Sequence, residues 1–209
     1  MIIDLHVHTN PLSSDSVMDA EEAIQEAKRI GLDGICLTEH NKVWELEDIQ
    51  RLSSKWNFPV WRGVEVEVVE GHILVFGLYR DFEGTIRVDE LRRWVSEADG
   101  IMVVAHPFKG FRVFDFSDLK LSPEQASKRP VFKSVDAIEA FNGRSNEREN
   151  NMAHEVGKIL GLRETGGSDA HSVGELGRCV TILEDNITTE ADLIAQLRAG
   201  TFKADYFHR

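Results

Sequence analysis

The sequence predicts an α/β fold in which helices cover a largely parallel β-sheet. Two observations support this prediction: short apolar runs alternate with amphipathic segments along the 209 residues, and the composition, 42% hydrophobic and 29% charged, is that of a globular protein. Repeated strand–helix alternation is typical of parallel sheets with helices packed outside. About seven or eight candidate strands are present, and a closed barrel is one way to use them. We expect one domain over residues 1–209.

The first half of the chain carries clear signals for the ends of its elements. A helix is expected to begin after Asp19, where Glu22 completes a capping box, and to end at Gly31. Gly71 separates two apolar segments and predicts a hairpin. The expected strands are Ile2–Leu5, Ile35–Thr38, Val60–Val69, Ile73–Leu78 and Ile101–Ala105. Two further helices are expected, Glu45–Trp56 with Leu46 facing inward, and one capped by Asp89 that buries Ala98.

The second half continues the alternation after one irregular segment. Residues from Pro107 to about 134 lack a clear period and hold several aromatic and basic residues, as active-site lids and binding loops do. The strands expected beyond it are Val135–Phe141, Arg163–Gly166 and Cys179–Leu183, and the helices are Asn146–Leu160 and Thr189–Ala199, which Gly200 ends.

The acidic composition narrows the classes of partner. The formal net charge is −12, whereas a nonspecific nucleic-acid binder needs positive charge to neutralise phosphates. No run of about 18 apolar residues is present, and the start of the chain lacks the pattern of a signal peptide. We therefore expect no membrane partner, no nucleic-acid polymer as ligand, and a cytoplasmic location in which Cys36 and Cys179 are reduced core residues.

Histidines gather at the ends of the predicted strands. In a parallel α/β barrel these ends share one face, where active sites form. His6 and His8 are two residues apart, as are Asp169 and His171, so in extended backbone both members of a pair point the same way and can bind one metal ion. Imidazole with carboxylate is the ligand set of zinc, manganese and iron hydrolases. The residues at strand ends are His6, His8, His40, Glu65, His106, Asp169 and His171.

Spacing alone leaves several carboxylates open. Glu67 faces the same side of its strand as Glu65 and competes with it as a ligand. Glu39 is ambiguous, and Asp15 lies in a serine-rich run where it could equally be a turn residue or a helix cap. His154 lies inside a polar helix and is interpreted as a surface residue.

Six short motifs follow one another along the chain. They are DLHVHT at Asp4–Thr9, TEH at Thr38–His40, GVE at Gly63–Glu65, GH at Gly71–His72, AHP at Ala105–Pro107 and GGSDAH at Gly166–His171. This ordered set resembles the PHP domain, the polymerase-and-histidinol-phosphatase superfamily, although many members have TDH at the second motif. The resemblance implies a distorted (β/α)7 TIM-like barrel that holds two to three divalent ions of zinc, manganese or iron. It also selects Glu65 over Glu67, adds Asp15 and His72, and implies nine ligands: His6, His8, Asp15, His40, Glu65, His72, His106, Asp169 and His171.

The implied activity is hydrolysis of phosphate esters of small metabolites or nucleotides by a hydroxide that bridges metals in a trinuclear site. Glu65 suits a bridging role, and either Asp169 or a water would protonate the leaving alkoxide. Substrate orientation is assigned to Arg144, which follows a predicted strand, and to Lys109 and Arg112 within the irregular segment, because basic side chains bind phosphate. No obligatory protein partner is inferred.

Three other classes were weighed against this one. A nuclease ranks lower because no polymerase domain and no basic track are visible in the sequence. An amidohydrolase-type enzyme also begins with an HxH pair but often uses a lysine that bridges its metals, and no lysine lies at a candidate strand end. A non-catalytic metal-binding module would lack ligands, whereas no position of the nine is lost.

Overall fold

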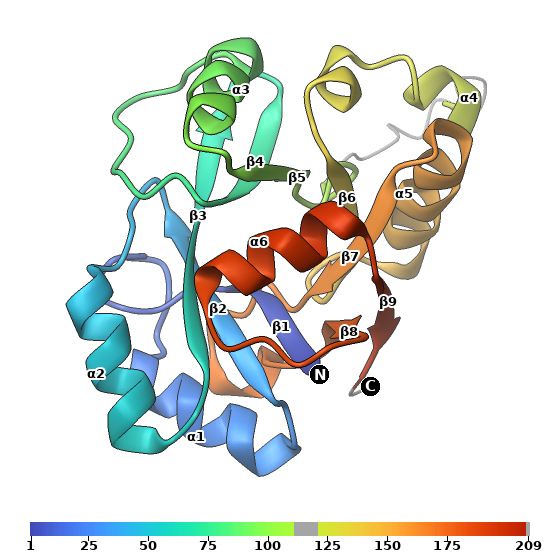
Figure 1. The fold of residues 1–209 in the computed structure, drawn as a ribbon. Helices are drawn as coiled ribbons and strands as arrows, with labels where there is room; N and C mark the ends of the chain where they lie inside the picture. Colours follow the sequence, from blue (N-terminus) through green and yellow to red (C-terminus); the bar gives the residue numbers. More distant parts are fainter. Residues whose placement is uncertain (111–120, 208–209) are drawn as a thin grey trace.

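The computed structural model describes residues 1–110 and 121–207, which form a mixed α/β fold around a nearly closed, barrel-like sheet (Figure 1). The strands are β1 (Ile2–Val7), β2 (Gly34–His40), β3 (Val60–Val68), β4 (Gly71–Phe76), β5 (Ile101–Val104), β6 (Ala137–Asn142), β7 (Arg163–Gly167), β8 (Cys179–Leu183) and β9 (Phe202–Tyr206). The α-helices are α1 (Ala20–Ile30), α2 (Leu46–Trp56), α3 (Val88–Glu97), α4 (Pro123–Ala126), α5 (Glu147–Leu160) and α6 (Glu190–Ala199), with 3-10 turns at Pro130–Lys133 and Val173–Glu175.

The sheet is mixed, with the strand order β7-β6-β5-β4-β3-β2-β1-β8-β9. Its runs β1–β2–β3 and β5–β6–β7 are parallel, as the alternation of strands and helices predicts. The prediction of a parallel sheet is wrong elsewhere, because β4 is also antiparallel to β5, and β8 is antiparallel to β1 and β9. The β3–β4 pairing confirms the predicted hairpin, while β9 was missed. The count of seven β/α units and the single domain stay predictions.

Two glycines allow β7, at the far edge of the sheet, to approach β1 and β8. A Cβ atom on Gly166 would lie 2.4 Å from the carbonyl oxygen of Val180, and one on Gly167 would lie 2.4 Å from Cβ of His6. Beyond β7, the amide of Asp169 donates to the carbonyl of His6 at 2.7 Å. The segment after β7 therefore lies directly beside β1, and the motif GGSDAH forms the seam at which the sheet nearly closes.

Bulges interrupt β1, which borders this seam, and β6, which pairs with β7. The register shifts between Asp4 and Val7 in β1, and between Glu139 and Phe141 in β6. In β1, Leu5 packs in the interior cluster but Val7 packs in an outer cluster with α1 and α2. The extra residue thus turns the end of the strand, as bulges commonly do at barrel rims.

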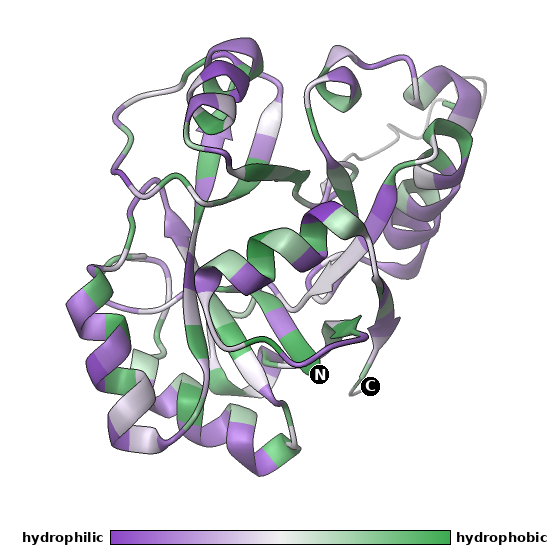
Figure 2. Cartoon of the chain, viewed as in Figure 1, coloured by the Kyte–Doolittle hydropathy of each residue, from purple (hydrophilic) through white to green (hydrophobic). Residues whose placement is uncertain are grey.

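The barrel interior is apolar at the end that α6 covers. Phe76 and Leu5 are almost wholly buried there and belong to one cluster with Leu193 and Leu197 of α6. Figure 2 shows that the helices around the sheet carry both hydrophobic and hydrophilic residues, as expected of helices with one buried face. No helix formed by the described residues is long and apolar enough to cross a membrane.

The helix signals were mostly correct. Asp19 caps α1 with a complete capping box, and Gly31 ends it with φ of 87°. Three details were wrong: Leu46 is 43% exposed because it lies in the first turn of α2, Ala98 is exposed beyond the end of α3, and Asp89 lies inside α3, whose N-cap is Arg87. The described part of the irregular segment, 107–110 and 121–134, is not wholly irregular, because it contains α4 and a 3-10 turn.

Candidate metal centre

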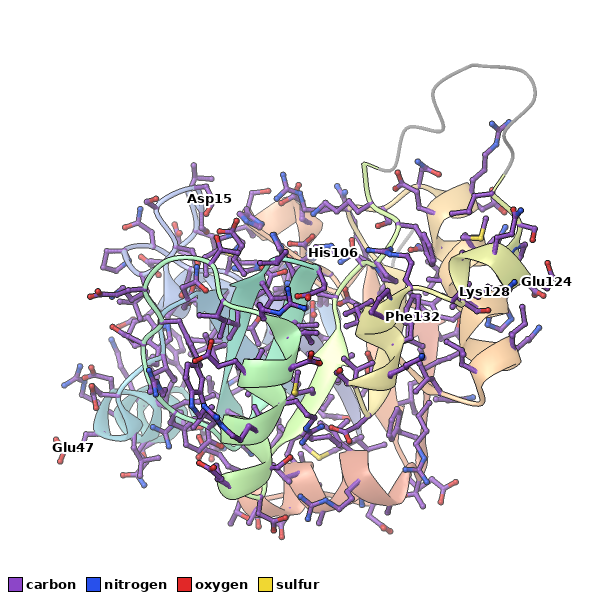
Figure 3. The ribbon with its side chains drawn as sticks, turned by 90° about the horizontal axis from the view of Figure 1, so that it is seen from above. Asp15, Glu47, His106, Glu124, Lys128 and Phe132 are labelled. Atoms are coloured by element: carbon purple, nitrogen blue, oxygen red, sulfur yellow. The ribbon has the colours of Figure 1, made fainter. Side chains whose placement is uncertain are left out.

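Nine polar side chains from separate elements lie together at one end of the barrel. His6 in β1, His40 in β2, Glu65 in β3 and His72 in β4 come from the strands themselves, while the others follow β1, β5 or β7 in loops: His8, Asp15, His106, Asp169 and His171. Seen from above, Asp15 lies toward the periphery and His106 nearer the middle of the molecule (Figure 3). These are the nine residues that the sequence motifs select.

Glu65 lies at the centre of this group. Its side chain is 1% exposed, whereas Glu67 is exposed, so the structure places Glu65 and not Glu67 among the histidines. The nitrogen–oxygen distances to Glu65 are 2.8 Å from His40, 2.9 Å from His106, 3.0 Å from His72, 3.4 Å from His8 and 3.5 Å from His6. Five imidazoles therefore converge on one carboxylate.

Two other carboxylates complete the group. Oδ2 of Asp15 lies 3.1 Å from Nε2 of His171 and 3.3 Å from Nε2 of His40. Oδ1 of Asp169 lies 3.5 Å from Nε2 of His8. Three sets of residues each offer potential ligand atoms that lie within 4.8 Å of one another, and some residues belong to two sets. The sets are His8, His40 and His171; His6, His8 and Asp169; and His6, Glu65 and His106.

Three buried atoms in this group make no hydrogen bond of good geometry to the described residues: Nε2 of His6, Nε2 of His8 and Oε2 of Glu65, although this last atom lies 2.8 Å from Nδ1 of His40. An unpartnered buried polar atom is costly, so such atoms usually mark a bound water, an ion or a functional site. Imidazole nitrogen and carboxylate oxygen are donors that zinc, manganese and iron accept. The residues present therefore fit divalent metal ions.

The charge states of these groups suit cation binding. Burial lowers the pKa of His8 to about 3, so this imidazole is neutral near pH 7 and keeps a lone pair. Burial opposes charge on Glu65, but the surrounding histidines, His6 first, hold its pKa well below the usual range. The pKa of Asp169 is likewise lowered, against the effect of burial, by His6 and His8. Both carboxylates are therefore anionic.

The backbone is strained at two of the nine positions. His106 has φ of 25° and Asp169 has φ of 55°, in a region that residues with a side chain rarely adopt. Each is held by hydrogen bonds, since the amide of Asp169 donates to His6 and the amide of His106 donates to Glu139 at 2.9 Å. Strain that the surroundings maintain is frequent at binding and catalytic sites.

Two of the three predicted substrate-binding residues border this group. Nζ of Lys109 contacts Oδ2 of Asp169. Nη1 of Arg144 lies 2.8 Å from Nδ1 of His171. Arg112 lies outside the described residues. His154 is not among these residues, but it is half-buried and not simply a surface residue, since it pairs with Glu164 at 2.8 Å and packs against Phe141.

Three buried carboxylates lie around the group, and their roles were not predicted from the sequence. Glu39 accepts hydrogen bonds from the Thr9 amide, the Ser13 hydroxyl and the Trp44 indole, so it fixes the loops that follow β1 and β2. Asp4 accepts from two amides near the seam, and burial raises its pKa to about 6. Glu139 is the third, and a charged residue inside the apolar run of β6 was the signal available for it.

Comparison with known proteins confirms the resemblance to the PHP superfamily. A family model described as PHP-associated matches residues 147–202. An uncharacterized protein of Methanocaldococcus jannaschii is 25% identical over 157 residues, which cover 68% of this chain and 82% of that protein.

Similar folds occur in solved structures, and the names of three of these indicate different reactions. A protein of Bifidobacterium adolescentis assigned as a metal-dependent phosphoesterase has a TM-score of 0.67 at 16% identity, over 93% of this chain and 95% of that chain. A lesion-specific endonuclease of Pyrococcus furiosus has a TM-score of 0.60 at 17% identity, over 98% of this chain but 58% of its own. Histidinol phosphate phosphatase of Lactococcus lactis, solved with zinc, L-histidinol and phosphate, has a TM-score of 0.51 at 15% identity, over 97% and 98%. At these identities the likeness establishes the fold alone.

Proposed function

We propose that this chain is a metal-dependent phosphoesterase acting on phosphate esters of small metabolites or nucleotides. The observation that carries the proposal is the convergence of five histidines on buried Glu65, with three ligand-type atoms there left without hydrogen-bond partners. Burying so many polar atoms together is costly, and a bound cation would offset that cost. The fold, shared with proteins named for phosphate ester hydrolysis, supports the reaction class.

The nine clustered residues are the proposed ligands of two to three ions of zinc, manganese or iron. When bound, such ions supply Lewis acidity toward phosphoryl oxygens and activate water as a nucleophile. Two sets that share no residue, His8–His40–His171 and His6–Glu65–His106, support at least two ions, and Asp15, His72 and Asp169 are the ligands left to complete a trinuclear arrangement. Glu65 is assigned the bridging role because its two oxygens face different histidines, Oε1 toward His106 and Oε2 toward His40.

The residues around the ligands are assigned to the substrate. A pocket of about 370 Å³ beside the cluster is lined in part by His72, His106 and Lys109, a volume that suits a small ester. Lys109 and Arg144 approach the cluster from two different loops and would hold the non-reacting phosphoryl oxygens. Of the two candidates for the proton donor to the leaving oxygen, Asp169 or a water, the lowered pKa of Asp169 and its contact with Lys109 favour the water.

The two contacts made by Nδ1 of His171 support the assignment of Arg144 to the substrate. Nδ1 of His171 lies 2.9 Å from the carbonyl of Asp169, a contact that requires a hydrogen on Nδ1. It also lies 2.8 Å from Nη1 of Arg144, which can only donate. Both contacts cannot be hydrogen bonds at once. Ligation through Nε2 of His171 would place the hydrogen on Nδ1 and release Arg144 for a phosphate.

The net charge of −12 favours a small substrate over a nucleic-acid polymer, because a polymer of phosphates is bound mainly through many cations. A nuclease is for this reason only the second candidate, and an amidohydrolase-type enzyme is less favoured still.

An activity screen tests the proposal. Protein reconstituted with zinc, manganese or iron would be assayed against phosphomonoesters, phosphodiesters, nucleotides, oligonucleotides and amides, with metal content measured in parallel. We expect two to three equivalents of metal and release of phosphate that EDTA abolishes. Less than about half an equivalent after reconstitution, or equal turnover in EDTA, would overturn the proposal. Turnover of oligonucleotides or amides alone would transfer the assignment to the corresponding alternative.

A further inference from the structure

Glu139 faces hydrogen-bond donors on both of its carboxylate oxygens. The side chain lies on β6, is 1% exposed and is not among the nine clustered residues. Oε1 lies 2.9 Å from Nδ1 of His6. Oε2 accepts from the amide of His106 at 2.9 Å and from Nδ2 of Asn142 at 3.0 Å. One buried carboxylate thus contacts two of the proposed metal ligands from behind.

The orientation of the Asn142 amide is fixed by contacts other than the one to Glu139, so Nδ2 is the atom that donates to Glu139. Its Oδ1 accepts from the amide of Arg144 at 3.0 Å, which leaves Nδ2 to face Glu139 and Asp169. Its backbone is held on both sides by Asn150, whose Oδ1 accepts from the Asn142 amide and whose Nδ2 donates to the Asn142 carbonyl, each at 3.1 Å. Oε2 of Glu139 must therefore be an acceptor.

The other oxygen decides the state of His6. A carboxylate beside Nδ1 accepts a hydrogen from it, so the hydrogen that a metal ion would displace from the ring is the one on Nε2, and Nε2 is the nitrogen left to ligate. Nε2 of His6 is one of the three buried atoms without a hydrogen-bond partner, and it points toward Glu65 and Asp169. The contact from behind thus exposes the ligating nitrogen at the front.

We propose that Glu139 is a positioning residue that holds His6 in the Nδ1–H tautomer and anchors the strained loop of His106, and so sets the metal affinity of the centre. This inference rests on the proposed function, since it concerns the affinity of that same site. Carboxylates behind metal-binding histidines commonly act in this way, and their loss typically lowers metal affinity by about 10–100-fold.

Glutamine cannot replace Glu139 in either orientation. If its amide nitrogen faces His6, it donates to Nδ1 and drives the hydrogen to Nε2, which then cannot bind a metal ion. If its oxygen faces His6, the amide nitrogen meets two donors, the His106 amide and Nδ2 of Asn142. The isosteric variant Glu139→Gln therefore has to break one of the two functions while leaving the volume of the core unchanged.

The chain offers a matched control in a second carboxylate–histidine pair. Oε2 of Glu164 lies 2.8 Å from Nδ1 of His154, close to the 2.9 Å of the Glu139–His6 pair. Both members are partly exposed, at 21% and 32%, and neither belongs to the cluster. The change Glu164→Gln is chemically identical to Glu139→Gln and differs only in where it falls.

The test is a zinc competition titration of the metal-free wild type, E139Q and E164Q, with folding checked by thermal unfolding. We expect E139Q to bind at least one equivalent about 10–100-fold more weakly and E164Q to match the wild type within about twofold. Equal affinity in folded E139Q would overturn the role of Glu139 and leave the proposed function standing, whereas a wild type that binds none of zinc, manganese and iron would overturn the proposed function itself.

A second measurement uses the wild type alone, so it does not depend on whether the variant folds. It tests the tautomer of His6 directly. Long-range ¹H–¹⁵N spectra of zinc-loaded wild type should show a hydrogen on Nδ1 of His6 and none on Nε2. A hydrogen on Nε2, or zinc shifts on Nδ1, would overturn the inference.

Discussion

The two ends of the barrel interior are built by the same strands but are held together differently. At one end, Leu5 and Phe76 pack against α6, and burial of their apolar surface stabilises the fold directly. At the other end, Glu65 and His8 are equally buried, but some of their polar atoms have no partner. Burial there carries a cost until a ligand arrives. The apolar end therefore supplies the stability that the polar end, shaped for binding, does not.

The largest effect is expected from damage to the apolar end. Phe76 is fully buried, and its ring packs over Gly63 of the neighbouring strand β3. Phe76→Ala therefore leaves a cavity that the sheet cannot easily close. We expect a loss of about 3–5 kcal/mol in the free energy of unfolding, measured by urea denaturation of metal-free protein. Metal affinity of the folded fraction should stay within about threefold. A large loss of affinity would show that the two ends are not separable.

The reverse experiment targets the polar end. Glu65→Gln removes the carboxylate on which five histidines converge, so metal content should fall and kcat/KM should drop at least about 100-fold, or about 2.7 kcal/mol. Elemental analysis and kinetics on the best substrate would measure both. Glu67→Gln, two residues along the same strand but exposed, is the matched control and should leave both unchanged. Full metal content in Glu65→Gln would contradict the central role of this residue.

A smaller effect is expected at the rim, where Arg144 contacts His171 but is not a proposed ligand. Arg144→Ala should lower kcat/KM by about 1.5–3 kcal/mol, as for a lost charged hydrogen bond, with metal content unchanged. Arg148→Ala, which removes the same charge from an exposed position of α5, provides the control. Wild-type kinetics in Arg144→Ala would move substrate recognition to Lys109 and Arg112.

The smallest effect is expected outside the barrel. Asp19 accepts a hydrogen bond from the amide of Glu22 at 2.8 Å and caps α1. Asp19→Ala should cost about 1 kcal/mol in the free energy of unfolding and leave zinc affinity unaltered. A change in metal affinity would show that α1 controls the position of the Asp15 loop that precedes it.

Local signals in the sequence were enough to predict most elements and to select the residues of the cluster. Capping at Asp19 and termination at Gly31 depend on neighbours a few residues away, which the sequence displays. The motif order brought Asp15 and His72 into the set, and the fold places both beside the other histidines. Spacing could not separate Glu65 from Glu67, because both face the same side of β3 and differ in how deeply their side chains are buried.

What the sequence did not predict depends on partners distant in the chain. The direction of β8 and the pairing of β9 are set by which strand edge is free, and alternation of polar and apolar residues does not encode that. The bulge in β1 lets Leu5 and His6 both serve the interior, which strict alternation forbids. The role of Glu139 required knowing that His6, 133 positions away, lies against it.

The seam between β1 and the segment after β7 has a consequence for how the molecule opens. The contacts there join residues 162 and 164 positions apart, so they form only when nearly the whole chain has been organised. An ion that draws ligands from His6 and His8 on one side and from Asp169 on the other binds only the closed form, and its binding free energy adds to the work of opening. Amide hydrogen exchange at His8 and Asp169, whose N–H groups bridge the seam, should therefore slow as metal is added, while the amides of α1 and α6 keep their own rates.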